Sequence, residues 1–202
     1  MRAIRQEGGR VNQKRRTRSE LVATAITLLD QGKRPTIPEL AEAAGVSRAT
    51  AYRYFSSQEA LLMEITLEVR ATEVEERIAR QPASDDAFER LEHLVESTVG
   101  VVLEHEAMFR IMLRASLEPK IDEHHVRKAR RVRWIEEALE PIREKVSTPV
   151  LAHVIGGVVP YLGIEAVIAL KDLYDLNSEE VMNQSKWACK ALLRAALSNP
   201  EL

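Results

Sequence analysis

The chain has 202 residues, of which 45% are hydrophobic and 4% aromatic, with one cysteine and a formal net charge of −2. This length and apolar content suffice for one substantial core, or for a small domain joined to a larger one. The scarcity of aromatic residues favours packed helices over sheets. A single cysteine, Cys189, excludes an internal disulfide and a metal cluster built on cysteines.

Membrane and secretory segments are not expected. The longest apolar stretch, residues 154–162, contains two glycines and a proline and is too short to span a bilayer. The N-terminus carries arginines with no apolar segment behind them, so it does not look like a secretory signal. We therefore expect a soluble protein of the cytoplasm with no membrane partner.

The charges are unevenly distributed along the chain. Residues 1–58 hold eleven Lys or Arg and five Asp or Glu, a balance of +6, whereas the remaining 144 residues carry a balance of −8. A basic module attached to an acidic body is typical of proteins that bind a polyanion. A basic disordered tail on an ordinary protein explains the same charges, and charge alone leaves both interpretations open.

The first elements follow from local patterns. Residues 1–13 are polar and contain two adjacent glycines, which predicts a disordered basic arm. Apolar residues recur at helical spacing from about residue 14 to residue 31. Thr36 and Glu39 then have the spacing of a capping box, and the helix that they begin should end at Gly45.

Helices account for the rest of the chain. Ser47 is placed to cap a short helix over residues 48–54, and Ser57 opens a longer one over residues 57–79. Five more helices are predicted, at residues 85–104, 105–117, 120–146, 149–173 and 178–197. No strand pattern and no internal repeat appear, so the predicted fold class is all-α.

The segment from Thr36 to Phe55 carries the strongest functional signal. A short helix, a tight turn at Gly45-Val46 and a second short helix make a helix-turn-helix. The major groove of DNA admits one helix, whose exposed side chains reach the base edges. One face of the second helix carries Arg48, Ala49, Tyr52 and Arg53. The opposite side carries Val46, Ala51 and Phe55, which can pack on the neighbouring helices.

Three motifs occur here in order: Gly-Val-Ser at 45–47, Thr-x-Tyr-x-x-Phe at 50–55 and Ser-x-Glu-x-Leu-Leu at 57–62. With them, residues 17–65 closely resemble the DNA-binding domain of the TetR family of bacterial transcriptional regulators. The stretch from Gly163 to Ala166 and the residues near Trp187 resemble such regulators more loosely. The resemblance implies an N-terminal three-helix DNA-binding domain followed by a larger helical ligand-binding and dimerisation domain.

The resemblance also implies roles for single residues. Thr50, Tyr52 and Tyr54 match positions that usually contact phosphates or bases. Arg48 and Ala49 match positions that vary with the operator sequence, and Thr17 lies where the first helix approaches the DNA backbone. The expected DNA contacts are Thr17, Thr36, Ser47, Arg48, Ala49, Thr50, Tyr52, Arg53, Tyr54 and Gln58.

Three points about these contacts stay open. The family usually has Lys where this chain has Gln58, whose amide can donate to a phosphate but releases no counterion. The arm offers Arg2, Arg5, Arg10, Lys14, Arg15 and Arg16, for which insertion into the minor groove competes with idle disorder. A cluster of Tyr52, Tyr54 and Phe55 on a short helix can also be plain core.

By resemblance, the helices from residue 85 to residue 173 enclose a small-molecule pocket. The candidate lining residues are Phe88, Leu91, Val95, Met108, Phe109, Met112, Trp134, Tyr161 and Glu165. Adaptable methionine and aromatic side chains suit a mostly apolar ligand, although the same residues at helical spacing also build an ordinary core. Glu165 lies among apolar neighbours and needs a partner.

The body shows no motif of an enzyme. Asp122 and His125 share a helical face, but the second half of a metal site is missing. The basic run at residues 127–133 fits a solvated helix face, and no phosphate loop or nucleophile motif appears. We therefore expect no catalytic residue, no metal and no cofactor.

The resulting hypothesis is a homodimeric repressor that a small, mostly apolar ligand releases from double-stranded operator DNA. The expected parts are the arm (1–13), the DNA-binding domain (14–56), a connecting helix (57–79) and the ligand-binding and dimerisation domain (80–202). The two C-terminal helices should form the dimer interface through Val154, Gly156, Gly157, Val158, Leu162, Gly163, Ile168, Val181, Trp187, Ala188, Ala191, Leu192 and Ala195. The alternatives are a regulator without a ligand, and an all-α binding protein or enzyme that keeps the helix-turn-helix only as scaffold.

Overall fold

A computed structural model of the chain describes residues 2–31, 33, 35–116 and 125–201. Every regular element in these ranges is a helix, which confirms the all-α prediction. The chain divides into two compact units, Met1–Thr72 and Glu73–Leu202, and the boundary falls inside helix α4 (Gln58–Ala79).

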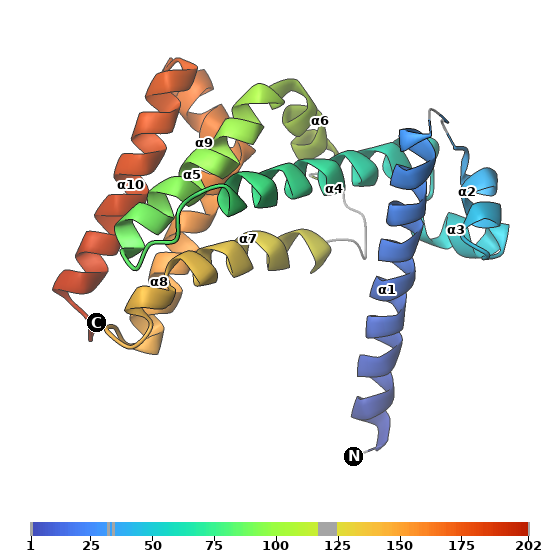
Figure 1. The fold of residues 1–202 in the computed structure, drawn as a ribbon, viewed down its shortest axis with the longest axis horizontal. Helices are drawn as coiled ribbons and strands as arrows, with labels where there is room; N and C mark the ends of the chain where they lie inside the picture. The colour runs from blue at the N-terminus through green and yellow to red at the C-terminus, as the bar shows by residue number, and fades with distance from the viewer. Residues whose placement is uncertain (1, 32, 34, 117–124, 202) are drawn as a thin grey trace. The chain divides into compact units, whose positions relative to one another are not determined.

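The N-terminal unit contains α1 (Arg2–Asp30), α2 (Ile37–Ala43), α3 (Arg48–Tyr54) and the first part of α4. Helices α2 and α3 lie beside the C-terminal half of α1 (Figure 1). All four helices contribute to one apolar core, which consists of Leu21, Val22, Ala25, Ile37, Leu40, Ala41, Ala51, Tyr54, Phe55, Leu61 and Ile65. The core thus holds a short helix pair against two longer helices.

Helix α1 is longer than the sequence predicts. It begins at Arg2 rather than near residue 14, so the backbone of residues 2–13 is helical where a disordered arm was expected. Once a helix is nucleated, each further residue adds one hydrogen bond, so an existing helix extends at low cost. The side chains of residues 2–12, 14 and 15 lie outside the described part of the chain, and so do the contacts expected of them.

The C-terminal unit is built around α5 (Ala87–Glu104) and α10 (Ser178–Ser198), which run antiparallel along each other (Figure 1). Helix α5 also packs on α6 (Glu106–Ser116), α7 (His125–Ala138) and α9 (Ile164–Ile168), and α10 packs on α8 (Thr148–Val158). Fully buried side chains from these helices fill the centre, including Leu91, Val95 and Val99 of α5, Ile135 of α7, Val158 of α8 and Leu193 of α10.

The single helix predicted at residues 149–173 is wrong. In its place α8 continues into a 3₁₀ turn at Val159–Leu162 (η2), and α9 continues into a π turn at Ala169–Leu173 (η3). Pro160 has no N–H to donate to a helical hydrogen bond, and Gly163 has an extended backbone that separates the two halves. The apolar periodicity runs through this break, which is why the sequence pattern hides it.

The helix predicted at residues 120–146 is also shorter in the structure. Helix α7 ends at Ala138 and is followed by a 3₁₀ turn at Glu140–Ile142 (η1) that contains Pro141. The predicted start of this helix falls among residues 117–124, which lie outside the described ranges.

In the described part of the chain, no helix taken alone has the length and apolarity needed to cross a bilayer. The segments Thr148–Leu162 and Ile164–Leu173 meet that criterion only as a pair, and they are bent by 59° relative to each other.

Candidate nucleic-acid interface

The start of α2 is fixed by the predicted capping box. The Thr36 backbone N–H donates to Glu39 Oε2 at 2.7 Å, and the Glu39 N–H donates back to Thr36 Oγ1 at 3.4 Å. These bonds satisfy donors that a helix N-terminus otherwise leaves unpaired. The hydrogen bond from the Thr36 backbone holds the pKa of Glu39 below its ordinary value, and the Thr36 hydroxyl adds to this effect.

The turn between the two short helices depends on one glycine. Gly45 has a φ of +67°, a left-handed conformation that side chains disfavour, although no atom would obstruct a Cβ there. The Val46 N–H then donates to the Ala41 carbonyl at 2.9 Å. Ser47 caps α3, because its Oγ accepts from the Thr50 N–H at 3.1 Å. The chain therefore turns from α2 into α3 within four residues, 44–47.

Helix α3 presents four exposed side chains on one side: Arg48, Ala49, Tyr52 and Arg53. We call this set the reading face. Tyr52 is 50% exposed although it is a large aromatic residue, whereas Ala51 and Phe55 behind it are fully buried. The predicted division of α3 into an exposed and a packed side is confirmed.

Three residues that were expected to contact DNA are buried or half-buried. Tyr54 is only 6% exposed and belongs to the core, so its ring supports α3 from behind. Thr50 is half-buried and its hydroxyl lies 2.9 Å from Ser47 Oγ. Thr17 is half-buried on α1. Contacts from these residues to DNA stay predictions.

Gln58 has a partner that the sequence did not indicate. Its Nε2 donates to the Pro35 carbonyl at 2.6 Å, so it ties the first turn of α4 to the segment that leads into α2. Pro35 is buried and Gln58 is half-buried. The two residues are far apart in the chain, and no local motif signals their contact.

The ligand candidates of the C-terminal unit lie on α5 and on the elements that pack against it. Leu91, Val95, Phe109, Met112 and Trp134 are buried, and Phe88, Met108 and Tyr161 are half-buried. Glu165 is different, because it is exposed and pairs with Arg131 of α7 at 3.1 Å. Gly163 leaves room for this pair, since a side chain there would collide with both partners. The partner that Glu165 needs is thus an arginine.

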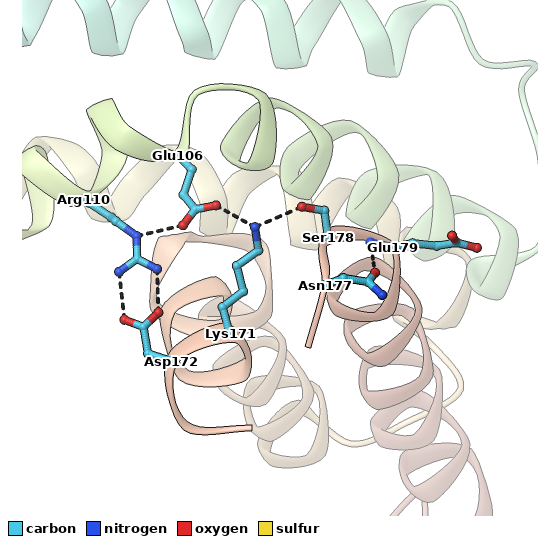
Figure 2. A network of polar contacts seen from close by, with 7 residues as sticks. All are labelled: Glu106, Arg110, Lys171, Asp172, Asn177, Ser178 and Glu179. Carbon is cyan, nitrogen blue, oxygen red and sulfur yellow. Dashed lines mark hydrogen bonds and ion pairs between the residues drawn. The ribbon is translucent and has the colours of Figure 1, made fainter. Parts of the chain in front are cut away.

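A polar network ties α6 to the end of η3 and the start of α10 (Figure 2). Arg110 donates to both carboxylate oxygens of Asp172 at 2.7 and 2.8 Å and to Glu106 at 2.8 Å. Lys171 donates to Glu106 at 2.7 Å and to Ser178 at 2.9 Å. The two positive charges of Arg110 and Lys171 balance the two negative charges of Glu106 and Asp172. Sequence reasoning missed it, because its helices are about sixty residues apart.

A second cluster brings together three side chains that can bind metal. Ligand atoms of Glu73, Glu104 and His105 all lie within 4.8 Å of one another. Arg77 donates to Glu73 at 2.7 Å and binds Glu104 through two of its nitrogens. The guanidinium group therefore supplies the positive charge that a metal ion would otherwise bring to these carboxylates.

Comparison with known protein families gives a match in the N-terminal unit. Residues 21–65 match the family described as bacterial regulatory proteins, tetR family. The match begins at Leu21 in the core part of α1 and ends at Ile65 in α4, so it includes the whole helix-turn-helix and the reading face. No curated protein sequence matches the chain.

Solved structures share the fold over most of the chain. A TetR transcriptional regulator from Rhodococcus sp. RHA1 gives a TM-score of 0.53 at 18% identity, covering 89% of this chain and 97% of that one. A tetR-family transcriptional regulator from Streptomyces coelicolor gives 0.53 at 19%, covering 91% and 83%. These likenesses show that the helical body shares its fold with those two proteins. The capped helices, the glycine turn and the exposed α3 face of residues 21–65 thus form a DNA-binding domain of the tetR family of bacterial regulatory proteins.

Proposed function

We propose that this regulator is a dimeric repressor, and that a small, mostly apolar ligand releases it from its operator. The observation that carries the DNA-binding part is the reading face, where two arginines and a half-exposed tyrosine project from a helix whose other side is fully packed. A helix held in this way can enter the major groove without losing its own core contacts.

The reading face supplies the contacts to bases. Arg48 and Arg53 can each donate two hydrogen bonds to a guanine, and Tyr52 can reach a phosphate or a thymine methyl group. Backbone contacts are assigned to residues around this face, at Thr17, Thr36, Ser47, Thr50, Tyr54 and Gln58. Ala49 has a small side chain, which allows α3 to approach base pairs that its neighbours contact.

We propose a dimer face that is narrower than the one the sequence suggests. Val154, Val158, Leu162, Val181 and Ala188 of the expected interface are buried within the protomer. The two C-terminal helices still expose apolar or small residues, among them Ala152 and Gly156 of α8 and Trp187 and Ala195 of α10. We propose that these residues, with the half-buried Ile155 and Ala191, meet the same surface of a second copy.

The ligand is proposed to bind in the C-terminal unit among the methionine and aromatic side chains of α5, α6 and α7. A ligand that binds the DNA-free conformation more tightly lowers the affinity for DNA by the same factor by which DNA lowers the affinity for the ligand. A coupling of about 1–3 kcal/mol is typical of such linkage.

The test is a fluorescence-anisotropy titration with two duplexes: a random sequence, and one that the wild-type chain selects from a random pool. A regulator binds the selected duplex more tightly, and its affinity falls steeply with salt because phosphate contacts release counterions. Binding of neither duplex, or binding that is insensitive to salt, would show that the helix-turn-helix is only scaffold.

Tyr52→Ala makes the test specific to the reading face. The variant should bind the selected duplex at least about tenfold more weakly, as expected for loss of one good contact, with an unchanged thermal melt. Tyr174→Ala is the matched control, because Tyr174 is also an exposed tyrosine but lies in the C-terminal unit. Equal affinity of both variants would contradict the assignment.

A further inference from the structure

Arg18 of α1 contacts two other helices of the N-terminal unit through one guanidinium group. Its Nε donates to Glu64 Oε1 at 3.0 Å and its Nη2 donates to Glu64 Oε2 at 2.9 Å, so the pair with α4 is bidentate. The same guanidinium lies 5.6 Å from the centre of the Phe55 ring, within the range of a cation–π contact.

This pair differs from an ordinary surface ion pair. The side chains of Arg18 and Glu64 are only 17% and 23% exposed, whereas those of the neighbouring pair Arg16–Glu20 are 74% and 56% exposed. Bidentate geometry and partial burial strengthen an ion pair, because less of the attraction is screened by water. An exposed pair four residues apart on one helix contributes little.

The position of Phe55 at the end of α3 connects this contact to the reading face. Phe55 is the C-cap of α3, its N–H donates to the Ala51 carbonyl, and its ring is buried in the core. Helix α3 has only seven residues. A helix of two turns has few contacts that fix its direction, so a charge held against the ring at its end restrains where the reading face points.

We propose that Arg18 is a positioning residue for DNA recognition: its pair with Glu64 and its contact with Phe55 hold the end of the recognition helix against α1 and α4. This inference rests on the proposed reading face. It assigns to Arg18, which is basic and lies in the DNA-binding unit, a role other than neutralising a phosphate.

Two variants separate these roles. Arg18→Lys keeps the positive charge but cannot form the bidentate pair. Glu64→Gln keeps the shape of the side chain and removes its charge, and a carboxylate does not itself bind phosphate. Each variant is titrated with the duplex that the wild-type chain selects from a random pool and with a random duplex, at several salt concentrations, and melts are followed by circular dichroism.

A positioning role predicts that both variants bind the selected duplex about tenfold more weakly, the size of a typical coupling between contacting residues. Their affinity for the random duplex and the slope of affinity against salt should stay as in the wild type. Arg80→Lys is the matched control, since Arg80 just after α4 forms an exposed pair with Glu76 four residues away, and it should bind both duplexes normally.

Three results would overturn the inference. Wild-type affinity of Arg18→Lys together with equal or tighter binding by Glu64→Gln would make Arg18 a phosphate contact. A lower melting temperature with unchanged affinity of the folded variants would make the pair merely structural. Equal losses on both duplexes would mean that the pair does not orient the reading face. Failure of the proposed function is recognised separately, because the wild-type chain would then show no preference for the selected duplex.

Discussion

Gly157 of α8 lies directly against Leu192 of α10 within one protomer, where an added Cβ would come within 3.0 Å of Leu192 Cδ1. Real Cβ contacts are rarely so short, so the glycine lets the two helices approach closely. Leu192 therefore packs against Gly157 inside its own subunit, and both residues stay half-buried there. Their expected part in a dimer interface stays a prediction.

The first prediction concerns that contact. Leu192→Ala should lower the free energy of unfolding by about 2 kcal/mol, the lower end for truncating a packed leucine, because Leu192 is only half-buried. Urea unfolding at one fixed protein concentration measures this, since the stability of a dimer depends on concentration. Leu173→Ala is the control, because Leu173 is exposed and its truncation should change stability by less than about 0.5 kcal/mol.

Loss of the dimer without loss of protomer stability in Leu192→Ala would instead place Leu192 in an interface between subunits.

The second prediction concerns Ser185 of α10. This serine is fully buried, and its hydroxyl has no hydrogen-bond partner among the described residues. An unsatisfied buried hydroxyl costs free energy, and alanine is the better helix former. Ser185→Ala should therefore stabilise the protein by about 1 kcal/mol and raise Tm by about 2–4 °C. Ser198→Ala, at the exposed end of the same helix, should leave Tm nearly unchanged, and a lower Tm for Ser185→Ala would refute the prediction.

The third prediction concerns pH and the network of Figure 2. The Lys171 ammonium, with help from Arg110, holds the pKa of Glu106 below its ordinary value of 4.5, and the Arg110 guanidinium holds the pKa of Asp172 below 3.8. A carboxylate whose pKa is lower in the folded state stabilises the fold above its unfolded pKa, and this contribution is lost as the pH falls through the folded value. The network should therefore stabilise the protein at neutral pH and fade in acid.

Arg110→Met tests this. It should lower Tm at pH 7, and its difference from the wild type should shrink below about pH 4, where the carboxylates become protonated. Arg143→Met is the control, because Arg143 pairs with Glu140 on an exposed turn and such pairs contribute little. A difference that stays constant with pH would mean that Arg110 acts through packing and not through charge.

The elements of the N-terminal unit follow from local sequence. The capping box of Thr36 with Glu39, the turn at Gly45 and the cap at Ser47 are short-range signals, and the structure forms each of them as predicted. These local signals determine the two short helices and the turn between them, which is why the sequence alone predicts the reading face.

Contacts between distant parts of the chain could not be predicted in the same way. Arg18 with Glu64 and Arg110 with Asp172 are separated by 46 and 62 residues, and each residue alone looks like an ordinary surface charge. The break at Gly163 was missed because apolar residues continue at helical spacing on both sides. The apolar character of a residue also does not predict its burial: Val181 is buried, whereas Trp187 on the same helix is exposed.

The fourth prediction concerns the basic arm. Each phosphate that the arm neutralises should add about 0.9 to the slope of log affinity against log salt. Deleting residues 1–13 removes Arg2, Arg5 and Arg10, and should flatten the slope while leaving the sequence selected from a random pool nearly the same. An unchanged slope would show that the arm does not contact DNA. A changed sequence preference would show that it reads bases.

The last prediction concerns the proposed dimer. Trp187 is 63% exposed in the protomer, and Gly156 of α8 has open space where a Cβ would lie. Trp187→Asp should halve the mass measured by light scattering, because a charge buried in an interface without a partner is costly, while the melt of the protomer keeps its cooperative shape. The affinity for the operator should also fall, since the monomeric variant contacts only one half-site. Tyr174→Asp, which charges an equally exposed aromatic position in the turn before α10, should stay dimeric and bind normally. A wild-type chain that is monomeric both free and on its operator would rule out the interface, and with it the two-fold symmetry expected of the operator.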